Sequence, residues 1–246
     1  MKDSADPRVS GFHSRRFCLR PGDEPELARA SGDSGFVAHL SACTHGATGW
    51  DWAFRLVRTG PGWGFVGDGR LTLFVDEPGH YVPADAKVGD AVAVRLPRAR
   101  ENLWPNRFSV HGGQGGPGSS HPYAKIYLPV KFTAAPALVE SFASRLADQL
   151  HFGLYVSNAP ADFERADSAV VDVSLRDEVG VVRVLDAFLT AHPDALASFA
   201  PPHGTTPGPL GLARAEAGPG RADLCDGYGW RRSHEAIAAG SDVGLR

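Results

Sequence analysis

Short blocks of apolar residues and two helical periods divide this chain into two parts of different character. Apolar or alternating runs between 62 and 96, separated by GDG and EPG turn signals, predict short β-strands. Between 36 and 56 the pattern FVAHLSACTHGATGWDWAFRL predicts a helix interrupted at Gly46–Gly49. Bulky aromatic side chains in this part are expected in the core, namely Trp50, Trp52 and Trp63.

The second part alternates strand and helix patterns. Two amphipathic helices are expected, one capped by Thr133 and beginning near Pro136, the other over 177–191. Apolar positions of the first helix follow the helical period, namely Leu138, Val139, Phe142, Leu146 and Leu150. Strands are expected over the following ranges: 107–110, 124–131, 152–156 and 168–175. A short helix is expected over 230–239.

These patterns together predict an α+β fold with a boundary near residue 100. Residues 1–100 are expected to form a β-rich N-terminal region whose first ten residues or so are disordered. Residues 101–246 are expected to form a mixed α/β part, with a central sheet flanked by helices.

Composition excludes several classes of protein. Apolar residues make up 43% of the 246 residues and the net charge is −3, with no basic tract, so nucleic acid is not an expected partner. No apolar run is long enough to cross a membrane, and the charged N-terminus does not read as a secretory signal. Three separated cysteines without CxxC spacing fit a reducing cytoplasm better than a disulfide framework or a zinc site.

Lysine is rare among the 25 basic residues, being found only at positions 2, 87, 125 and 131. Alternation in the strand expected over 124–131 places Lys125, Tyr127 and Lys131 on one face. Lysine becomes a base when its surroundings lower its pKa, which arginine does not do in practice. The alternative is a solvated outer face on an amphipathic strand.

Arginines and histidines supply further candidates. Arg165 precedes a buried strand, where it could hold a phosphate or carboxylate, or simply pair with Asp162 or Asp167. The segment GYGWRRSHEAIAAG places cationic groups in the first turns of the last helix, where anions bind well, although a charged helix start explains them equally: Arg231, Arg232 and His234. Ala238 occupies the place of the second histidine of a zinc-protease motif, so no metal is expected.

The glycine-rich segment GGQGGPG at 112–118 follows a strand, but SSHPY comes after it in place of a helix or GK[ST]. We therefore expect a flexible lid or loop and no nucleotide site. His111 at the edge of this segment is a candidate proton donor.

Several short segments, taken in order, resemble the HopA-type type III effector family over about residues 104–240. They are NRFSVHGGQG (106–115), AKIYLPV (124–130), FERADSAVVDV (163–173), TTPGPLGLARAE (205–216) and GYGWRRSHEAIAAG (227–240). AKIYLPV is similar to the family's R-x-Y-L-N-V strand, with Lys125 in place of the usual arginine and Pro129 in place of asparagine.

The resemblance implies two settings, bacterial virulence effectors and the lyase of class V lanthipeptide and thioamitide biosynthesis. Such a lyase eliminates phosphate from phosphoserine or phosphothreonine of a precursor peptide, which leaves dehydroalanine or dehydrobutyrine. The implied partners are the leader and phosphorylated core of that peptide, a kinase and a cyclase; no cofactor is required.

Elimination needs a base, cations around the phosphate and an acid, and the chain offers a residue for each. Lys125 or Lys131 is the expected base, His111 the expected acid, and Tyr127 orients the lysine or protonates the leaving group. The expected phosphate-binding and substrate-binding residues are Arg107, Arg165, Arg231, Arg232 and His234. Lys125 could also act as one more phosphate-binding cation. The alternatives to a lyase are a non-catalytic adaptor that binds leader or phosphopeptide, and a host-directed effector.

Overall fold

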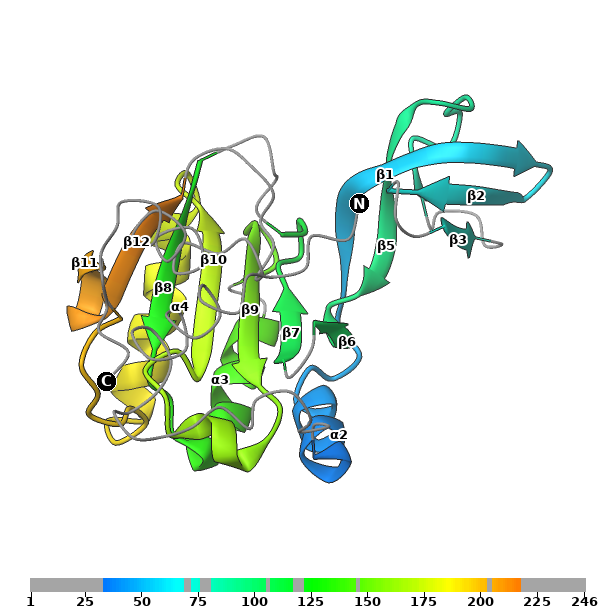
Figure 1. Ribbon diagram of the computed structural model, residues 1–246. Coiled ribbons are helices and arrows are strands. Elements are labelled where there is room, and N and C mark those ends of the chain that lie inside the picture. Colours follow the sequence, from blue (N-terminus) through cyan, green and yellow to red (C-terminus); the bar gives the residue numbers. More distant parts are fainter. Residues whose placement is uncertain are drawn as a thin grey trace, which may run out of the picture.

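Two antiparallel sheets and three helices form the part of the chain that the computed structural model describes (Figure 1). The described residues are 33–68, 72–75, 81–104, 107–116, 122–144, 147–202 and 205–217. The helix expected over 230–239 and the disorder expected near the N-terminus lie outside these residues. The helices, in chain order, are α2 (Ser34–Ala42), α3 (Ala135–Ala143) and α4 (Glu178–Ala191).

The first sheet has five strands in the order β3-β2-β1-β5-β4. Their bounds are β1 (Thr48–Gly60), β2 (Trp63–Gly67), β3 (Thr72–Val75), β4 (Tyr81–Val82) and β5 (Ala91–Pro97). The strands expected between 62 and 96 are therefore confirmed. One face of this sheet carries a small apolar core made of Phe54, Leu56, Val66, Val75, Val92 and Val94.

The segment from 36 to 56 is half helix and half strand, so the expectation of an interrupted helix is correct only for its first half. Asp33 begins α2, because its Oδ1 accepts hydrogen bonds from the backbone N–H groups of Gly35 (2.9 Å) and Phe36 (3.0 Å). His45 and Gly46 then adopt positive φ and turn the chain into β1. From there, pairing with β2 and β5 overrides the apparent helical pattern.

Contrary to expectation, the tryptophans do not lie in a core. Trp52 is 55% exposed, and Trp50 and Trp63 are only half-buried. The smaller residues Phe54 and Leu56, which alternate along β1, enter the core in their place.

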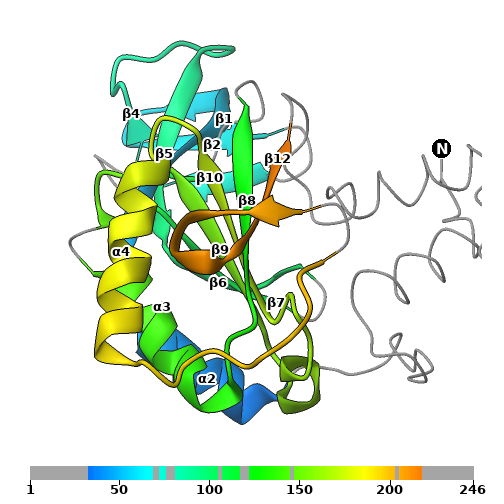
Figure 2. The same ribbon diagram turned by 90° about the vertical axis from the view of Figure 1, so that its left-hand side faces the viewer.

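The second sheet has seven strands in the order β11-β12-β8-β10-β9-β7-β6, and every pair in it is antiparallel. The bounds are β6 (Ala99–Trp104), β7 (Arg107–His111), β8 (Tyr123–Leu128), β9 (Phe152–Ser157), β10 (Ala169–Ser174), β11 (Thr206–Pro207) and β12 (Ala213–Ala217). In the described part of the chain, α2, α3 and α4 all lie on one side of this sheet, so the helices do not flank both faces (Figure 2). The α+β class is confirmed in its broad form.

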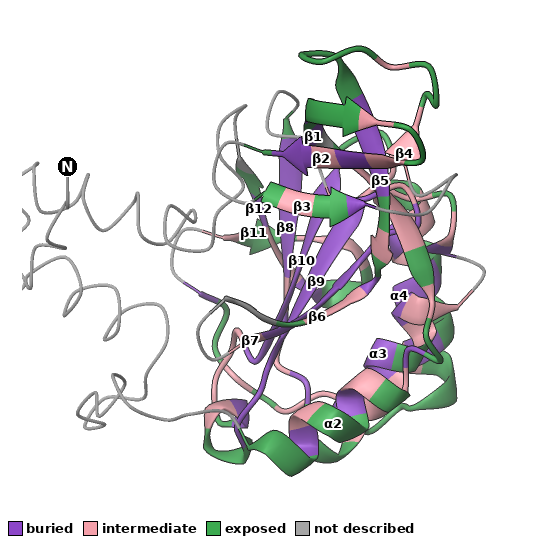
Figure 3. Ribbon diagram, turned by 90° about the vertical axis from the view of Figure 1, so that its right-hand side faces the viewer, coloured by how far each residue is buried: buried purple, intermediate pink, exposed green. Residues whose placement is uncertain are grey.

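The helix-covered face of the second sheet holds the main core. Alternation in β8 directs Ala124, Ile126 and Leu128 into it, as the sequence pattern predicts. On α3, Leu138, Val139 and Phe142 pack against the strands and are fully buried. The inner strands are accordingly the most deeply buried elements of the molecule (Figure 3).

Two details of α3 differ from expectation. The helix ends at Ala143, so Leu150 lies beyond it, and Leu146 is outside the described residues. Its N-cap is Ala134, without a side-chain cap, because a 3₁₀ turn at Phe132–Ala134 leads directly into the helix. The expected cap at Thr133 is therefore wrong.

Arg98 lies between the strands of the two sheets, after β5 and before β6. Its side chain is 1% exposed, and its guanidinium donates to the carbonyls of Phe142 (2.6 Å) and His111 (2.9 Å) and to Asp148 Oδ1 (2.9 Å). A cation at the carbonyl end of α3 is favourable for the helix dipole. Arg98 thus ties the junction to α3, while the division into two domains near residue 100 stays a prediction.

Candidate functional site

The side of the second sheet away from the helices carries polar side chains that are buried or half-buried. We call this side the polar sheet face. It comprises Arg100, Arg107, Ser109, His111, Tyr123, Lys125, Tyr127, Tyr155 and Asp172, placed by strand alternation opposite the core residues. Buried polar groups are costly unless they are paired, so this face needs an explanation beyond stability.

Strand register aligns the central residues of the polar sheet face in one row. Lys125 pairs with Asp172, Asp172 with Gly153, and Gly153 with His111. Because neighbouring strands lie about 4.8 Å apart, the row brings residues that are distant in sequence within about 15 Å. This alignment depends on pairing across four strands, which alternation within one strand does not reveal.

Lys125 and Asp172 form a buried ion pair in that row. The Lys125 Nζ donates to both carboxylate oxygens, at 2.8 and 2.7 Å, and the two side chains are 2% and 1% exposed. Burial raises the pKa of Asp172 above its usual 3.8, and Lys125 counteracts that rise. The solvated outer face considered for Lys125 is therefore wrong, and two of its three N–H groups are engaged by a single carboxylate.

His111 and Arg100 each present a buried nitrogen with no hydrogen-bond partner in the described structure, namely Nε2 of His111 and Nε of Arg100. Their strands are adjacent, because Arg100 pairs with Ser109 two residues before His111. Burial, and then the charge of Arg100, lower the pKa of His111 well below its usual 6.5. His111 is therefore neutral at pH 7, which is the form of imidazole that can accept a proton, and not the protonated acid expected for it.

Gly153 and Tyr155 are among the residues of this face that the sequence patterns did not predict. Gly153 leaves room for the phenol of Tyr155, since a Cβ built at Gly153 would lie 2.8 Å from the Tyr155 hydroxyl oxygen. The Tyr155 ring also contacts His111 edge-on, with centroids 6.3 Å apart. Tyr155 therefore lies over the gap in the row between Asp172 and His111. A glycine inside an apolar strand was the available signal, because it marks close approach of another group.

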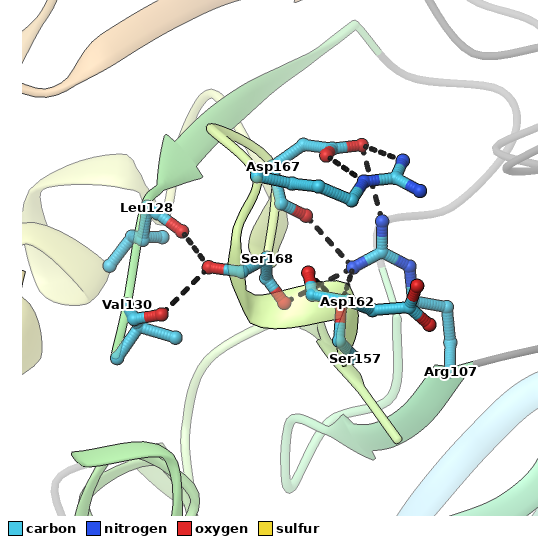
Figure 4. Close-up of polar contacts among 8 residues, drawn as sticks. Arg107, Leu128, Val130, Ser157, Asp162, Asp167 and Ser168 are labelled. Carbon is cyan, nitrogen blue, oxygen red and sulfur yellow. Dashed lines mark hydrogen bonds and ion pairs between the residues drawn. The ribbon is translucent and has the colours of Figure 1, made fainter. Parts of the chain in front are cut away.

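Arg107 and Arg165 meet at a second place, the end of the sheet where β10 begins. Both guanidiniums bind Asp167: Arg165 Nε lies 2.9 Å from Oδ1, and Arg107 NH2 lies 3.2 Å from Oδ2. Arg107 also donates to Ser157 Oγ (3.1 Å) and to the backbone carbonyl of Asp167 (2.8 Å) (Figure 4). The local Arg165–Asp167 pair considered for this segment is thus confirmed.

The Asp167 cluster is separate from the Lys125 row. Arg107 precedes His111 by four residues on β7, which corresponds to about 13 Å along a strand. Ser168 closes this end of the sheet, because its hydroxyl lies within 3.2 and 2.9 Å of the carbonyl oxygens of Leu128 and Val130 (Figure 4). The expected site residues are therefore divided between two clusters.

Tyr127 and Lys131 are the other two candidates on the strand expected over 124–131, and they lie in different surroundings. Tyr127 is half-buried on the polar sheet face, where it pairs with Val170. Lys131 is exposed and lies beyond the end of β8, where its N–H donates to the Ala195 carbonyl. The expectation that it shares a face with Lys125 is wrong, because the strand ends at Leu128.

Arg231, Arg232 and His234 lie outside the described residues. Within the described residues, no group of three His, Cys, Asp or Glu side chains is arranged to hold a metal ion, and no helix is long and apolar enough to cross a membrane.

The glycine segment that follows His111 is packed where it is described, contrary to the expected flexible lid. Gly112 N–H donates to Phe152 O, and Gly113 O accepts from Trp50 N, each at 2.9 Å. A Cβ on Gly112 or Gly113 would collide with the backbone of Leu150 or Asp148. These glycines therefore allow the loop to join β1 to the second sheet beside His111.

The sequence model of the HopA1 effector protein family matches residues 98–240, and the chain belongs to this family. The match covers β6 to β12, and with them the whole polar sheet face. A solved structure, that of the effector protein from Pseudomonas syringae pv. tomato strain DC3000, is similar with a TM-score of 0.43 and 12% identity, covering 98% of this chain and 88% of that chain. A search of curated proteins finds no match.

Proposed function

We propose that the protein is a metal-independent phosphoserine or phosphothreonine lyase that acts on a peptide. The observation that carries the proposal is the pair of buried, unpartnered nitrogens of His111 and Arg100, on the same sheet face as the Lys125–Asp172 ion pair. A neutral imidazole beside an arginine suits a reaction that removes a proton next to an anionic leaving group.

The reaction divides among these residues as follows. His111 Nε2 takes the proton from Cα of the phosphorylated residue, and the electron pair forms the Cα=Cβ double bond. The bond between Cβ and the phosphate oxygen breaks, and phosphate leaves with that bonding pair. Arg100 is ion-paired with Asp51 through NH2 (2.8 Å), but its Nε–H is unpartnered; it lies next to His111 and donates this N–H to the departing phosphate.

Lys125 has a supporting part in this scheme. Its ammonium is held by both oxygens of Asp172, so it fixes the position of that carboxylate in the row and does not serve as the base. Tyr155, between the ion pair and the imidazole, is placed to orient the substrate or His111. Of the two uses considered for Lys125, the geometry argues against the base, because the buried ammonium is already bound by Asp172.

Arg107 and Arg165 fit a different contact. Two guanidiniums meet at the carboxylate of Asp167, about 13 Å from His111. That distance suits a neighbouring part of a bound phosphopeptide better than the reacting phosphate itself. In a biosynthetic setting, the peptide would come from a precursor phosphorylated by a partner kinase.

The experiment incubates the protein with a synthetic phosphothreonine peptide, followed by mass spectrometry with and without an added thiol. A lyase removes phosphoric acid and leaves an alkene that adds the thiol. A phosphatase would leave threonine, which does not react. Bound peptide of unchanged mass would support the adaptor function and contradict the lyase.

A further inference from the structure

The first sheet has an outer face on which aromatic and arginine side chains gather, outside the region that matches the family. Strand register places Arg58, Phe65 and Phe74 in one cross-strand row, on the side opposite the Val66 core position. The same alternation adds further members, and we call the set the arginine–aromatic face: Arg55, Arg58, Arg95, Trp63, Phe65 and Phe74.

The aromatic rings of this face form one connected cluster. Phe65 lies 5.2 Å from Phe74 and 5.8 Å from Trp63, centroid to centroid. Gly60 allows this arrangement, because a Cβ there would lie 2.4 Å from the Trp63 ring. Phe74 is nevertheless 56% exposed, and Val57 and Trp52 on β1 are 52% and 55% exposed (Figure 3). A cluster of partly exposed aromatic rings such as Trp63, Phe65 and Phe74 is typical of an interaction site.

The arginines of this face have no carboxylate partner among the described residues. Arg55 donates to the Gly89 carbonyl (3.0 Å), Arg95 to Thr48 Oγ1 (3.0 Å), and Arg58 lies over the Trp63 ring at 5.6 Å. All three are exposed, and no described position paired on this side of the sheet is acidic. Arg214 of the second sheet, by contrast, binds both Glu178 and Glu216.

The charge around this face decides between two classes of polyanion. Residues 48–97 contain five Lys or Arg and six Asp or Glu residues, so the region is not basic as a whole. A nucleic acid requires a strongly positive domain, whereas a short acidic peptide needs only a local cluster of arginines beside apolar surface.

We propose that the arginine–aromatic face docks an acidic peptide segment in which carboxylates alternate with apolar side chains. The carboxylates bind Arg55, Arg58 and Arg95, and the apolar side chains pack on Phe65 and Phe74. This docking does not depend on the elimination proposed for the second sheet, and the two are measured separately.

The test uses fluorescence anisotropy with a short fluorescein-labelled peptide of alternating Glu and Val. The variant Arg55→Glu/Arg58→Glu is compared with Lys131→Glu/Arg183→Glu, which changes the net charge equally at exposed positions after β8 and on α4, outside the first sheet. We expect about a tenfold or greater loss of affinity in the first variant and a change of less than about twofold in the control. Added salt weakens binding by the wild type, as expected for exposed charges.

A second variant, Phe74→Ser, removes apolar surface without a change of charge and is also expected to weaken binding. Equal losses in the two charge variants would overturn the proposal, as would absence of binding by the wild type. Tighter binding of a short oligothymidylate or of a Lys–Val peptide would also overturn it. Circular dichroism of each variant checks that the fold is retained.

Discussion

The two faces of the seven-stranded sheet are equally buried in their central rows, but the side chains are apolar on one face and charged on the other. On the helix-covered face, Ile126 and Val171 are 0% exposed and belong to the apolar main core. On the polar sheet face, Lys125 and Asp172, which alternate with them on the same strands, are 2% and 1% exposed.

Burial therefore contributes differently to the stability of the fold on each face. Apolar burial contributes about 25 cal/mol per Å² and needs no partner. A buried ion pair roughly balances its own desolvation, and apolar side chains of similar volume would stabilise the fold at least as well. The helix-covered face explains stability, whereas the polar sheet face is explained by the chemistry proposed for it.

The largest expected effect comes from breaking the ion pair on one side only. Asp172→Ala leaves the Lys125 ammonium buried without its carboxylate, so we expect a loss of about 3–5 kcal/mol in the free energy of unfolding. Urea denaturation measures it. The double variant Lys125→Met/Asp172→Leu should regain most of this loss while remaining unable to eliminate phosphate. If Asp172→Ala alone cost less than about 1 kcal/mol, the pair would not be buried as described.

A substitution on the opposite face gives the matching measurement. Ile126→Ala opens a cavity under α3 and α4, and it should cost about 2–5 kcal/mol in the same denaturation experiment. Elimination per folded molecule should stay close to that of the wild type, because the change lies on the helix-covered face. A loss of activity without a loss of stability would contradict the division between the faces.

Gly153 offers a smaller change within the row. In Gly153→Ala the new methyl group lies 2.8 Å from the Tyr155 hydroxyl oxygen, so the phenol must move away from its place beside His111. We expect a cost of about 1–3 kcal/mol and slower elimination. Thermal unfolding and the rate of product formation check both effects. The double variant Gly153→Ala/Tyr155→Leu should recover the stability lost in Gly153→Ala. It should not recover the rate of elimination.

The smallest effect concerns pH and His111. Its pKa in the folded protein is well below 6.5, so below that pH the unfolded chain binds a proton that the folded protein does not. The free energy of unfolding should therefore fall, by up to about 1.4 kcal/mol per pH unit, as the pH drops below 6.5. In His111→Gln this part of the pH dependence should disappear. Identical pH profiles in denaturation of the two proteins would contradict the burial of a neutral imidazole.

Local patterns predicted β2, β3, β5, the strands from β7 to β10 and the apolar side of β8, because alternation is a property of a single strand, but they did not predict β4, β6, β11 or β12. They failed at β1, where pairing with β2 and β5 overrides a helical pattern, and at Lys131, where the chain leaves the strand after Leu128. Asp172, Arg100 and Gly153 join the site through register between strands distant in sequence. Register is set by the whole sheet, so no single segment reveals it.

The most direct test compares the rate of phosphoric acid loss from a phosphothreonine peptide by the wild type and by His111→Gln, with thiol trapping of the product. We expect a trapped alkene from the wild type and a rate at least about 100-fold lower for His111→Gln, with peptide binding retained. Elimination by His111→Gln at the wild-type rate, or a threonine product from the wild type, would contradict it.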